Sequence, residues 1–171
     1  CSIGLVARAS VADFRRSLFV AGRDSTALAA INIDANKVVS RLELGLTPRV
    51  MRVSEQSAKL VASDGRARRI AVADLTSGEV RHAPLSLVPS RLRISSDGWR
   101  LAAINNETGE IALVDLRLAR EKARFNAPVR IRDALFAADG RSLLIAADAK
   151  PGISIYDTDT GELTGTIDGP P

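Results

Sequence analysis

The chain has 171 residues, enough for one domain with a well-buried core, and its 46% hydrophobic and 26% charged residues exclude a largely disordered protein. The formal net charge of +4 is compatible with an anionic partner, but the basic residues are dispersed, which argues against a nucleic-acid-binding tail. A single cysteine, Cys1, and a single histidine, His82, exclude an intramolecular disulfide and the usual zinc site, and no apolar run approaches the roughly 20 residues of a membrane span.

Two sequence markers recur along the chain with one period of about 40 residues. The first is an aspartate that closes a short apolar strand, found at Asp34, Asp74, Asp115 and Asp157. The second is the first leucine of the preceding strand, found at Leu18, Leu60, Leu101 and Leu143. Two independent markers with the same period predict four tandem repeats.

Each repeat contains the turn signals of four short antiparallel strands. A proline opens three of them, at Pro48, Pro89 and Pro128. Hairpin turns of the Asp-Gly type are expected at 97–98 and 139–140, and turns of the form Asp-x-x-x-Gly-Glu at 74–79 and 157–162. The stretch 94–116 shows the pattern most clearly and serves as the reference for the other repeats.

The expected strands can be taken in chain order. The first repeat has strands at 5–12, 17–22, 28–34 and 37–44, and the second at 47–54, 58–63, 69–74 and 79–84. The third has strands at 89–95, 99–104, 110–115 and 120–126, and the fourth at 128–137, 141–146, 152–157 and 162–167. The third strand of each repeat is a nearly continuous apolar run, which indicates burial on both faces. Segment 116–125 has helix-forming content, but the repeat register predicts an outer edge strand.

Four-stranded units with a period of about 40 residues indicate a β-propeller. We expect an all-β single domain over 1–171, with four tandem four-stranded antiparallel blades at roughly 5–44, 47–84, 89–126 and 128–167. Its most regular segments resemble the blades of YVTN-type propellers, relatives of WD40 repeats: Pro89, Ile94–Gly98, Leu101–Ile104, Gly109–Asp115 and Leu135–Leu144. Three arrangements stay open: a ring of four blades, half of a larger ring completed by a second copy or another chain, and the ordered part of a longer polypeptide.

Arginines near the start of the first strands are the main candidates for a binding site. They are Arg49, Arg52, Arg91, Arg93, Arg130 and Arg132. In a propeller the first strand lines the central channel, and the two-residue period places Arg91 and Arg93 on one side of their strand and Arg130 and Arg132 on one side of theirs. Because guanidinium groups pair with carboxylate or phosphate, the set predicts an anion-attracting docking face. The alternative is that these arginines pair with acids of neighbouring blades.

Trp99, His82 and the recurring aspartates are also considered as possible site residues. Trp99, the only tryptophan, is either an exposed contact for a partner or packs against the next blade. His82 is expected to be a solvated strand-edge residue, and the recurring aspartates are expected to form turns, as is the segment 157–162 that superficially resembles a calcium loop. We therefore predict no catalytic residue, no metal site and no cofactor.

Together these observations favour a non-catalytic interaction or scaffold module, an accessory subunit that docks on a protein partner in an envelope or membrane-associated assembly. The alternative is the propeller portion of a redox or hydrolytic enzyme whose cofactor or active site lies outside this chain. Cys1 followed by Ser2 resembles the start of a mature bacterial lipoprotein, which implies an acylated Cys1 and an extracytoplasmic location, in the periplasm or attached to a membrane. The alternatives are a chain boundary at Cys1 and a cytoplasmic protein, and nucleic acid is the less favoured partner.

Overall fold

The computed structural model describes residues 14–128, 130–148 and 150–169. A short 3-10 turn, Phe14–Arg16, precedes strands that form four antiparallel sheets. The first two sheets contain β1 (Ser17–Ala21), β2 (Ala27–Asn32) and β3 (Lys37–Glu43), then β4 (Val50–Ser54), β5 (Lys59–Ser63), β6 (Arg69–Asp74) and β7 (Val80–Pro84). The third contains β8 (Arg91–Ile94), β9 (Arg100–Ile104), β10 (Glu110–Asp115) and β11 (Arg120–Asn126). The fourth contains β12 (Ile131–Phe136), β13 (Ser142–Ala147), β14 (Lys150–Asp157) and β15 (Leu163–Ile167).

We call these sheets blades 1 to 4. In blades 2, 3 and 4 the strands are hydrogen-bonded in chain order, so each is a four-stranded meander, as the turn signals predict. The expected strand 5–12 lies outside the described residues, and blade 1 is described by its other three strands. The predicted all-β propeller class is confirmed, and the predicted strand bounds differ from the structure by only a few residues.

The hydrophobic core consists of three clusters, one between each pair of successive blades. The central strands β6 and β10 have buried residues on both faces, as their continuous apolar runs predict, whereas the outer strand β11 alternates between exposed and half-buried residues. Leu60, Leu101 and Leu143 are fully buried in this core. Leu18, the corresponding residue of blade 1, is 56% exposed because it lies at an open end of the array.

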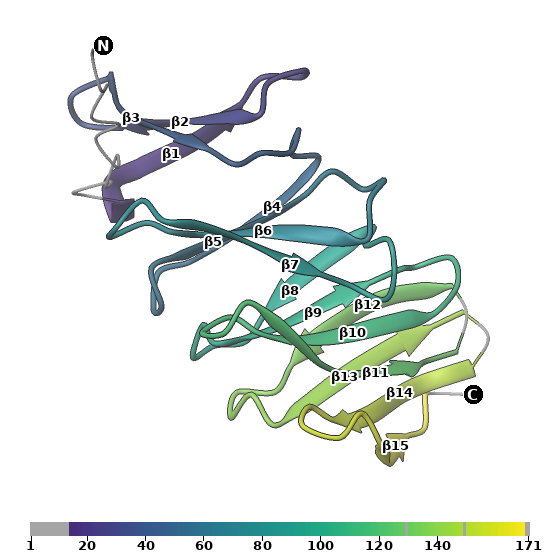
Figure 1. The fold of residues 1–171 in the computed structure, drawn as a ribbon. Coiled ribbons are helices and arrows are strands. Elements are labelled where there is room, and N and C mark those ends of the chain that lie inside the picture. Colours follow the sequence, from purple (N-terminus) through teal and green to yellow (C-terminus); the bar gives the residue numbers. More distant parts are fainter. Residues whose placement is uncertain (1–13, 129, 149, 170–171) are drawn as a thin grey trace.

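The described blades form an open arc, with blade 1 at one end and blade 4 at the other (Figure 1). The interpretation of a closed ring of four blades is therefore wrong for this structure. Large apolar side chains are exposed on both end blades, at Leu18 and Val20 in blade 1 and at Leu135 and Ile167 in blade 4. The two interpretations in which these blades are part of a larger assembly stay open.

One repeat marker was assigned to the wrong residue. Asp74, Asp115 and Asp157 each accept hydrogen bonds from backbone N–H groups of the turn that follows, as expected of turn formers. In blade 1 this role belongs to Asn32, whose Oδ1 accepts from the N–H of Ala35 at 2.8 Å. Asp34 is instead exposed and ion-paired to Arg16, with 2.8 Å between Oδ2 and Nε.

Candidate interaction surface

The meander topology divides the connections between two edges of the array. One edge, which we call the aspartate edge, contains the turns β4–β5, β8–β9 and β12–β13. It also contains the turns that lead to the outer strands, β2–β3, β6–β7, β10–β11 and β14–β15. The remaining connections lie along the opposite edge, which we call the arginine edge because Arg23, Arg49 and Arg66 lie there. Loops carried on a rigid scaffold are the usual place for binding residues, so each edge is a candidate interaction surface.

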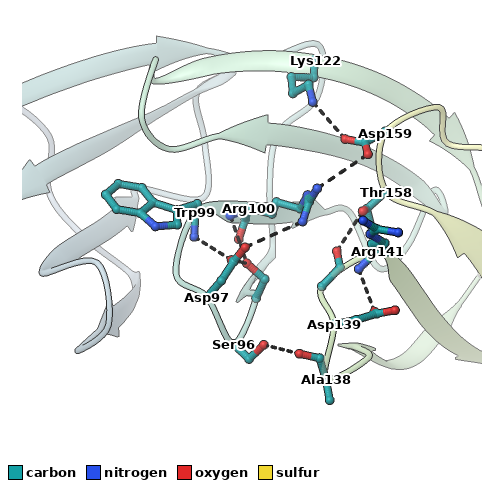
Figure 2. A network of polar contacts seen from close by, with 12 residues as sticks. Ser96, Asp97, Trp99, Arg100, Lys122, Ala138, Asp139, Arg141, Thr158 and Asp159 are labelled. Carbon is teal, nitrogen blue, oxygen red and sulfur yellow. Dashed lines mark hydrogen bonds and ion pairs between the residues drawn. The ribbon is translucent and has the colours of Figure 1, made fainter.

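At the aspartate edge, ion pairs join blades 3 and 4 (Figure 2). Asp159 lies 3.0 Å from Lys122 Nζ and 3.6 Å from Arg100 Nη2, and Arg100 Nη1 lies 3.7 Å from Asp97. The hydrogen bond from Lys122 is the main cause that lowers the pKa of Asp159 below its usual range. These charges are mutually compensated, so this part of the edge stabilises the junction between the blades.

Trp99 lies beside the same network (Figure 2). The side chain is half-buried, and the Arg117 guanidinium carbon lies 4.6 Å from the centroid of the indole ring. The backbone N–H of Trp99 donates to Asp97 Oδ1 at 3.0 Å. Trp99 is thus covered in part by a residue of its own blade, and its role as a contact for a partner stays a prediction.

The predicted pair Arg91 and Arg93 does share one side of its strand. Both side chains reach Asp133 of blade 4, at 3.1 Å from Arg91 Nη1 and 2.7 Å from Arg93 Nη2. Their guanidinium groups also donate to the carbonyls of Arg132 and Ala134. The hydrogen bond from Arg93 is the main cause that lowers the pKa of Asp133. Arg91 and Arg93 therefore follow the alternative interpretation, in which arginines pair with the acid of a neighbouring blade.

The prediction that Arg130 and Arg132 share one side of a strand is wrong. Arg130 precedes β12 and has a φ of +58°, and the register of β12 shifts between Ile131 and Asp133. This irregularity breaks the two-residue alternation on which the prediction depended. Arg132 is ion-paired to Asp148, with 2.7 Å between Nε and Oδ1.

The other two predicted arginines belong to blade 2 and its entry. Arg52 is exposed on β4, and its Nη1 donates to the carbonyl of Met51 at 2.7 Å. Arg49 precedes β4, and its backbone N–H donates to Ser63 O at 2.8 Å. The Arg49 side chain lines a surface cleft between blades 1 and 2.

This cleft is open to solvent, has a volume of about 380 Å³, and has a strongly basic lining. Its charged residues are Arg23, Asp24, Arg49, Asp64, Arg66 and Arg69. Of its four arginines, only Arg49 was singled out from the sequence. Two of the three missed arginines carry a sequence signal: one repeat later, the positions of Arg66 and Arg69 are occupied by Glu107 and Glu110.

Contacts between blades fix the wall of the cleft. Arg69 Nη2 donates to the carbonyl of Gly45 at 3.2 Å. One residue earlier, Leu44 O lies 2.8 Å from His82 Nε2, so His82 holds the β3–β4 connection against blade 2. His82 is exposed, as expected, but it also links two blades, which the sequence did not indicate. Gly45 has a φ of +65°, and a Cβ there would lie 3.0 Å from the His82 ring.

The arginines of the cleft lack the compensation found at the aspartate edge. Asp64 Oδ1 accepts from the backbone N–H groups of Arg66 and Ala67, both at 2.9 Å. Burial raises the pKa of Asp64, but these hydrogen bonds and the charges of Arg69 and Arg66 outweigh it and lower the pKa overall. Within the described parts of the chain, no carboxylate lies within ion-pair distance of any of the four guanidinium groups.

Three other predictions concern metals and membranes. Across residues 14–128, 130–148 and 150–169, the His, Cys, Asp and Glu side chains form no group of three placed to hold a metal ion. No helix in those same segments has the length and apolarity to cross a membrane. Cys1, the candidate for lipidation, lies outside the described residues.

The antiparallel blades and the clusters between them define the class of this chain as a β-propeller. No protein-family model matches the sequence, and no curated protein matches it either. The chain is similar to hydrazine synthase of Kuenenia stuttgartiensis, with a TM-score of 0.71 and 15% identity over 94% of this chain and 48% of the other. It is also similar to BamB of Moraxella catarrhalis, with a TM-score of 0.69 and 20% identity over 96% of this chain and 50% of the other.

Both similarities are similarities of fold, since the identities are low. The chain spans about half the length of each of these two solved structures. The propeller architecture inferred from the repeats is therefore confirmed, whereas the narrower resemblance to YVTN-type blades has no matching family model.

Proposed function

We propose that this chain is a non-catalytic interaction module, an accessory subunit that docks a protein partner in an envelope or membrane-associated assembly. The observation that supports it most directly is the excess positive charge of the cleft between blades 1 and 2, which is lined by four arginines and two aspartates. Three of these arginines lie on connections and Arg69 begins β6, and hydrogen bonds between blades hold the wall of the cleft. Loops held in place by a rigid scaffold of strands can present polar side chains that recognise another surface.

The contrast with the aspartate edge supports the same proposal. At the junction of blades 3 and 4, Lys122 and Arg100 are balanced by Asp159 and Asp97, so little charge is left for a partner. At the junction of blades 1 and 2, the arginines are exposed and their charge attracts an acidic surface over a Debye length of about 10 Å at 0.1 M salt. The proposed docking face is therefore the arginine edge near blades 1 and 2.

Isolation of the full protein from its native source under mild conditions tests this proposal. We expect a second protein to copurify in a fixed ratio, with a native mass that corresponds to the complex, and we expect the complex to dissociate as salt is raised. A native mass that corresponds to this protein alone, with nothing cross-linked to it in intact cells, would contradict the proposal.

We propose an extracytoplasmic location and acylation of Cys1 as part of the same function. The proposal depends on the Cys1–Ser2 residue pair, which lies outside the described residues. Intact mass of the protein taken from membranes checks it: acylation adds the mass of the acyl chains to Cys1. An unmodified N-terminal peptide that begins upstream of Cys1 would contradict acylation and leave the docking proposal unaffected.

A further inference from the structure

We propose that the cleft between blades 1 and 2 binds a short carboxylate-rich peptide segment, and that Arg49, Arg66 and Arg69 are the residues that recognise it. This inference rests on the proposed function as a docking module and names the chemistry of the partner. It goes beyond that function because it assigns one cleft and one class of ligand.

First, the β5–β6 connection does not need the charges of these arginines. The β5–β6 and β9–β10 connections both have five residues, and the pairs Lys59↔Asp74 and Arg100↔Asp115 set the two blades in the same register. In blade 2, Asp64 Oδ1 accepts from the two N–H groups at positions two and three further on. In blade 3, Asn105 Oδ1 accepts from the same two positions.

The charged residues at equivalent positions nevertheless have opposite signs. Arg66 and Arg69 in blade 2 correspond to Glu107 and Glu110 in blade 3, and Arg49 corresponds to Ser90. Because a connection of the same length forms with either sign, the charges of Arg66 and Arg69 are not required to form the β5–β6 connection, although Arg69 also donates a hydrogen bond to the carbonyl of Gly45. These arginines line one cleft, where their guanidinium groups can bind a ligand.

The charge inside the cleft, second, matches carboxylates. Four arginines and two aspartates line it, so its formal charge is +2. Asp64 is already satisfied by backbone N–H groups, which leaves the guanidinium groups without an internal carboxylate partner among the described residues. A guanidinium group binds a carboxylate through two parallel hydrogen bonds, and two or three carboxylates therefore match this cleft.

The lining of the cleft, third, favours an acidic peptide over a nucleic acid. Proteins that bind single-stranded nucleic acid combine a basic groove with aromatic side chains on which bases stack. None of the ten described residues that line the cleft is aromatic. The two aspartates in the lining would repel the closely spaced charges of a phosphate backbone. A peptide can place its separated carboxylates away from these aspartates, so the repulsion is weaker. The cleft is therefore better suited to a peptide.

The test uses the full chain and a rhodamine-labelled peptide of alternating Glu and Gly, with a Gln-Gly peptide as the neutral probe. Binding is measured by fluorescence anisotropy. We expect the acidic peptide to bind, the neutral peptide not to bind, and affinity to weaken as salt rises from about 0.05 to about 0.3 M. The double variant Arg66→Glu with Arg69→Glu carries the residue type of blade 3 and should lower the affinity about tenfold or more.

A matched variant controls for net charge. Arg41→Glu with Arg120→Glu changes two exposed outer-strand arginines by the same total charge, and should change the affinity less than about threefold. Arg49→Ser, which introduces the residue of blade 3, is a second and milder variant if the double variant fails to fold. Equal affinity of the wild type and both cleft variants would overturn the inference. Tighter binding of a labelled oligothymidine, lost in the same cleft variants, would overturn the assignment to a peptide.

The copurified partner distinguishes this inference from the proposed function. Loss of the partner from the cleft variant alone would support both. A partner that stays bound to the cleft variant would overturn this inference and leave the docking function standing. Peptide binding that depends on the cleft, in a protein with no partner in its native source, would support this inference and contradict the docking function.

Discussion

The β5–β6 and β9–β10 connections show how blades of one fold come to differ in what they can bind. Both have five residues and begin with a side-chain oxygen, from Asp64 or Asn105, that accepts two backbone N–H groups. The left-handed glycine lies at different positions, Gly65 in one and Gly109 in the other. The charges at equivalent positions are opposite. The strand register thus fixes the length and start of the connection, and leaves the charge free to vary.

The largest expected effect concerns the glycine of the blade 3 connection. Gly109 has a φ of +76°, and a Cβ there would lie 2.5 Å from the carbonyl oxygen of Ala127. Gly109→Ala should therefore lower the free energy of unfolding by about 2–4 kcal/mol. Urea unfolding followed by circular dichroism measures it.

The equivalent position in blade 2 is Arg68, and it provides the control. Arg68 is exposed, and its φ is not positive. Arg68→Ala should change the free energy of unfolding by less than about 0.5 kcal/mol. If Gly109→Ala and Arg68→Ala lowered the free energy of unfolding by similar amounts, the two positions would not differ in backbone conformation, and the prediction would be wrong.

The sequence predicted features that depend on residues close together in the chain. The bounds of β10 were predicted correctly because Gly109 and Asp115 mark its ends, and the repeat register correctly predicted the outer strand β11. The repeat marker in blade 1 was misplaced because only aspartates were considered as markers. Asn32 supplies the equivalent hydrogen-bond acceptor in that blade. With Asn32 as the first marker, the polar series and the leucine series have identical spacings along the whole chain.

The missed features depend on packing between blades. The ion pairs of Arg91 and Arg93 with Asp133 require the relative placement of β8 and β12, which local sequence does not contain. The register shift near Arg132 is likewise a property of how β12 pairs with β13. The cleft was not predicted for the same reason: Arg23 and Arg66 come from different blades and line one cleft only after folding.

The next largest effect is expected for Asp133, which is paired with arginines, in comparison with Asp64, which accepts backbone hydrogen bonds. Asp133→Asn removes the charge that holds Arg91 and Arg93, and should lower the free energy of unfolding by about 1 kcal/mol. Asp64→Asn keeps the acceptor oxygen, as Asn105 does in blade 3, and should cost less than about 0.5 kcal/mol. Chemical denaturation of both variants beside the wild type measures the difference. Equal losses would mean that Asp64 acts mainly through its charge.

The contribution of Asp133 should depend on pH, with a sign that follows from its lowered pKa. An unfolded aspartate has a pKa of about 3.9, and the folded state, with Arg93 as the main cause, holds the pKa of Asp133 below its usual range. The folded state therefore favours the ionised form, and the stabilisation is present above about pH 4 and lost as pH falls through the folded pKa. The difference in unfolding free energy between wild type and Asp133→Asn should be constant between about pH 7 and 5 and shrink at lower pH. A difference that grew on acidification would contradict the ion-pair assignment.

The smallest expected effect tests whether charge at the blade 2 connection is independent of the fold. Arg66→Glu with Arg69→Glu removes one hydrogen bond to Gly45 O and the attraction to Asp64, and both arginines are exposed. The free energy of unfolding should fall by less than about 0.5 kcal/mol per substitution, with an unchanged denaturant slope. Trp99, in blade 3 and away from the cleft, provides a fluorescence signal for the same transition. A loss well above this value would make the arginines part of the structural support of blade 2, as Arg91 and Arg93 are for the junction of blades 3 and 4. In that case the charge reversal between the two connections would reflect different packing, and its weight as an argument for binding would be lost.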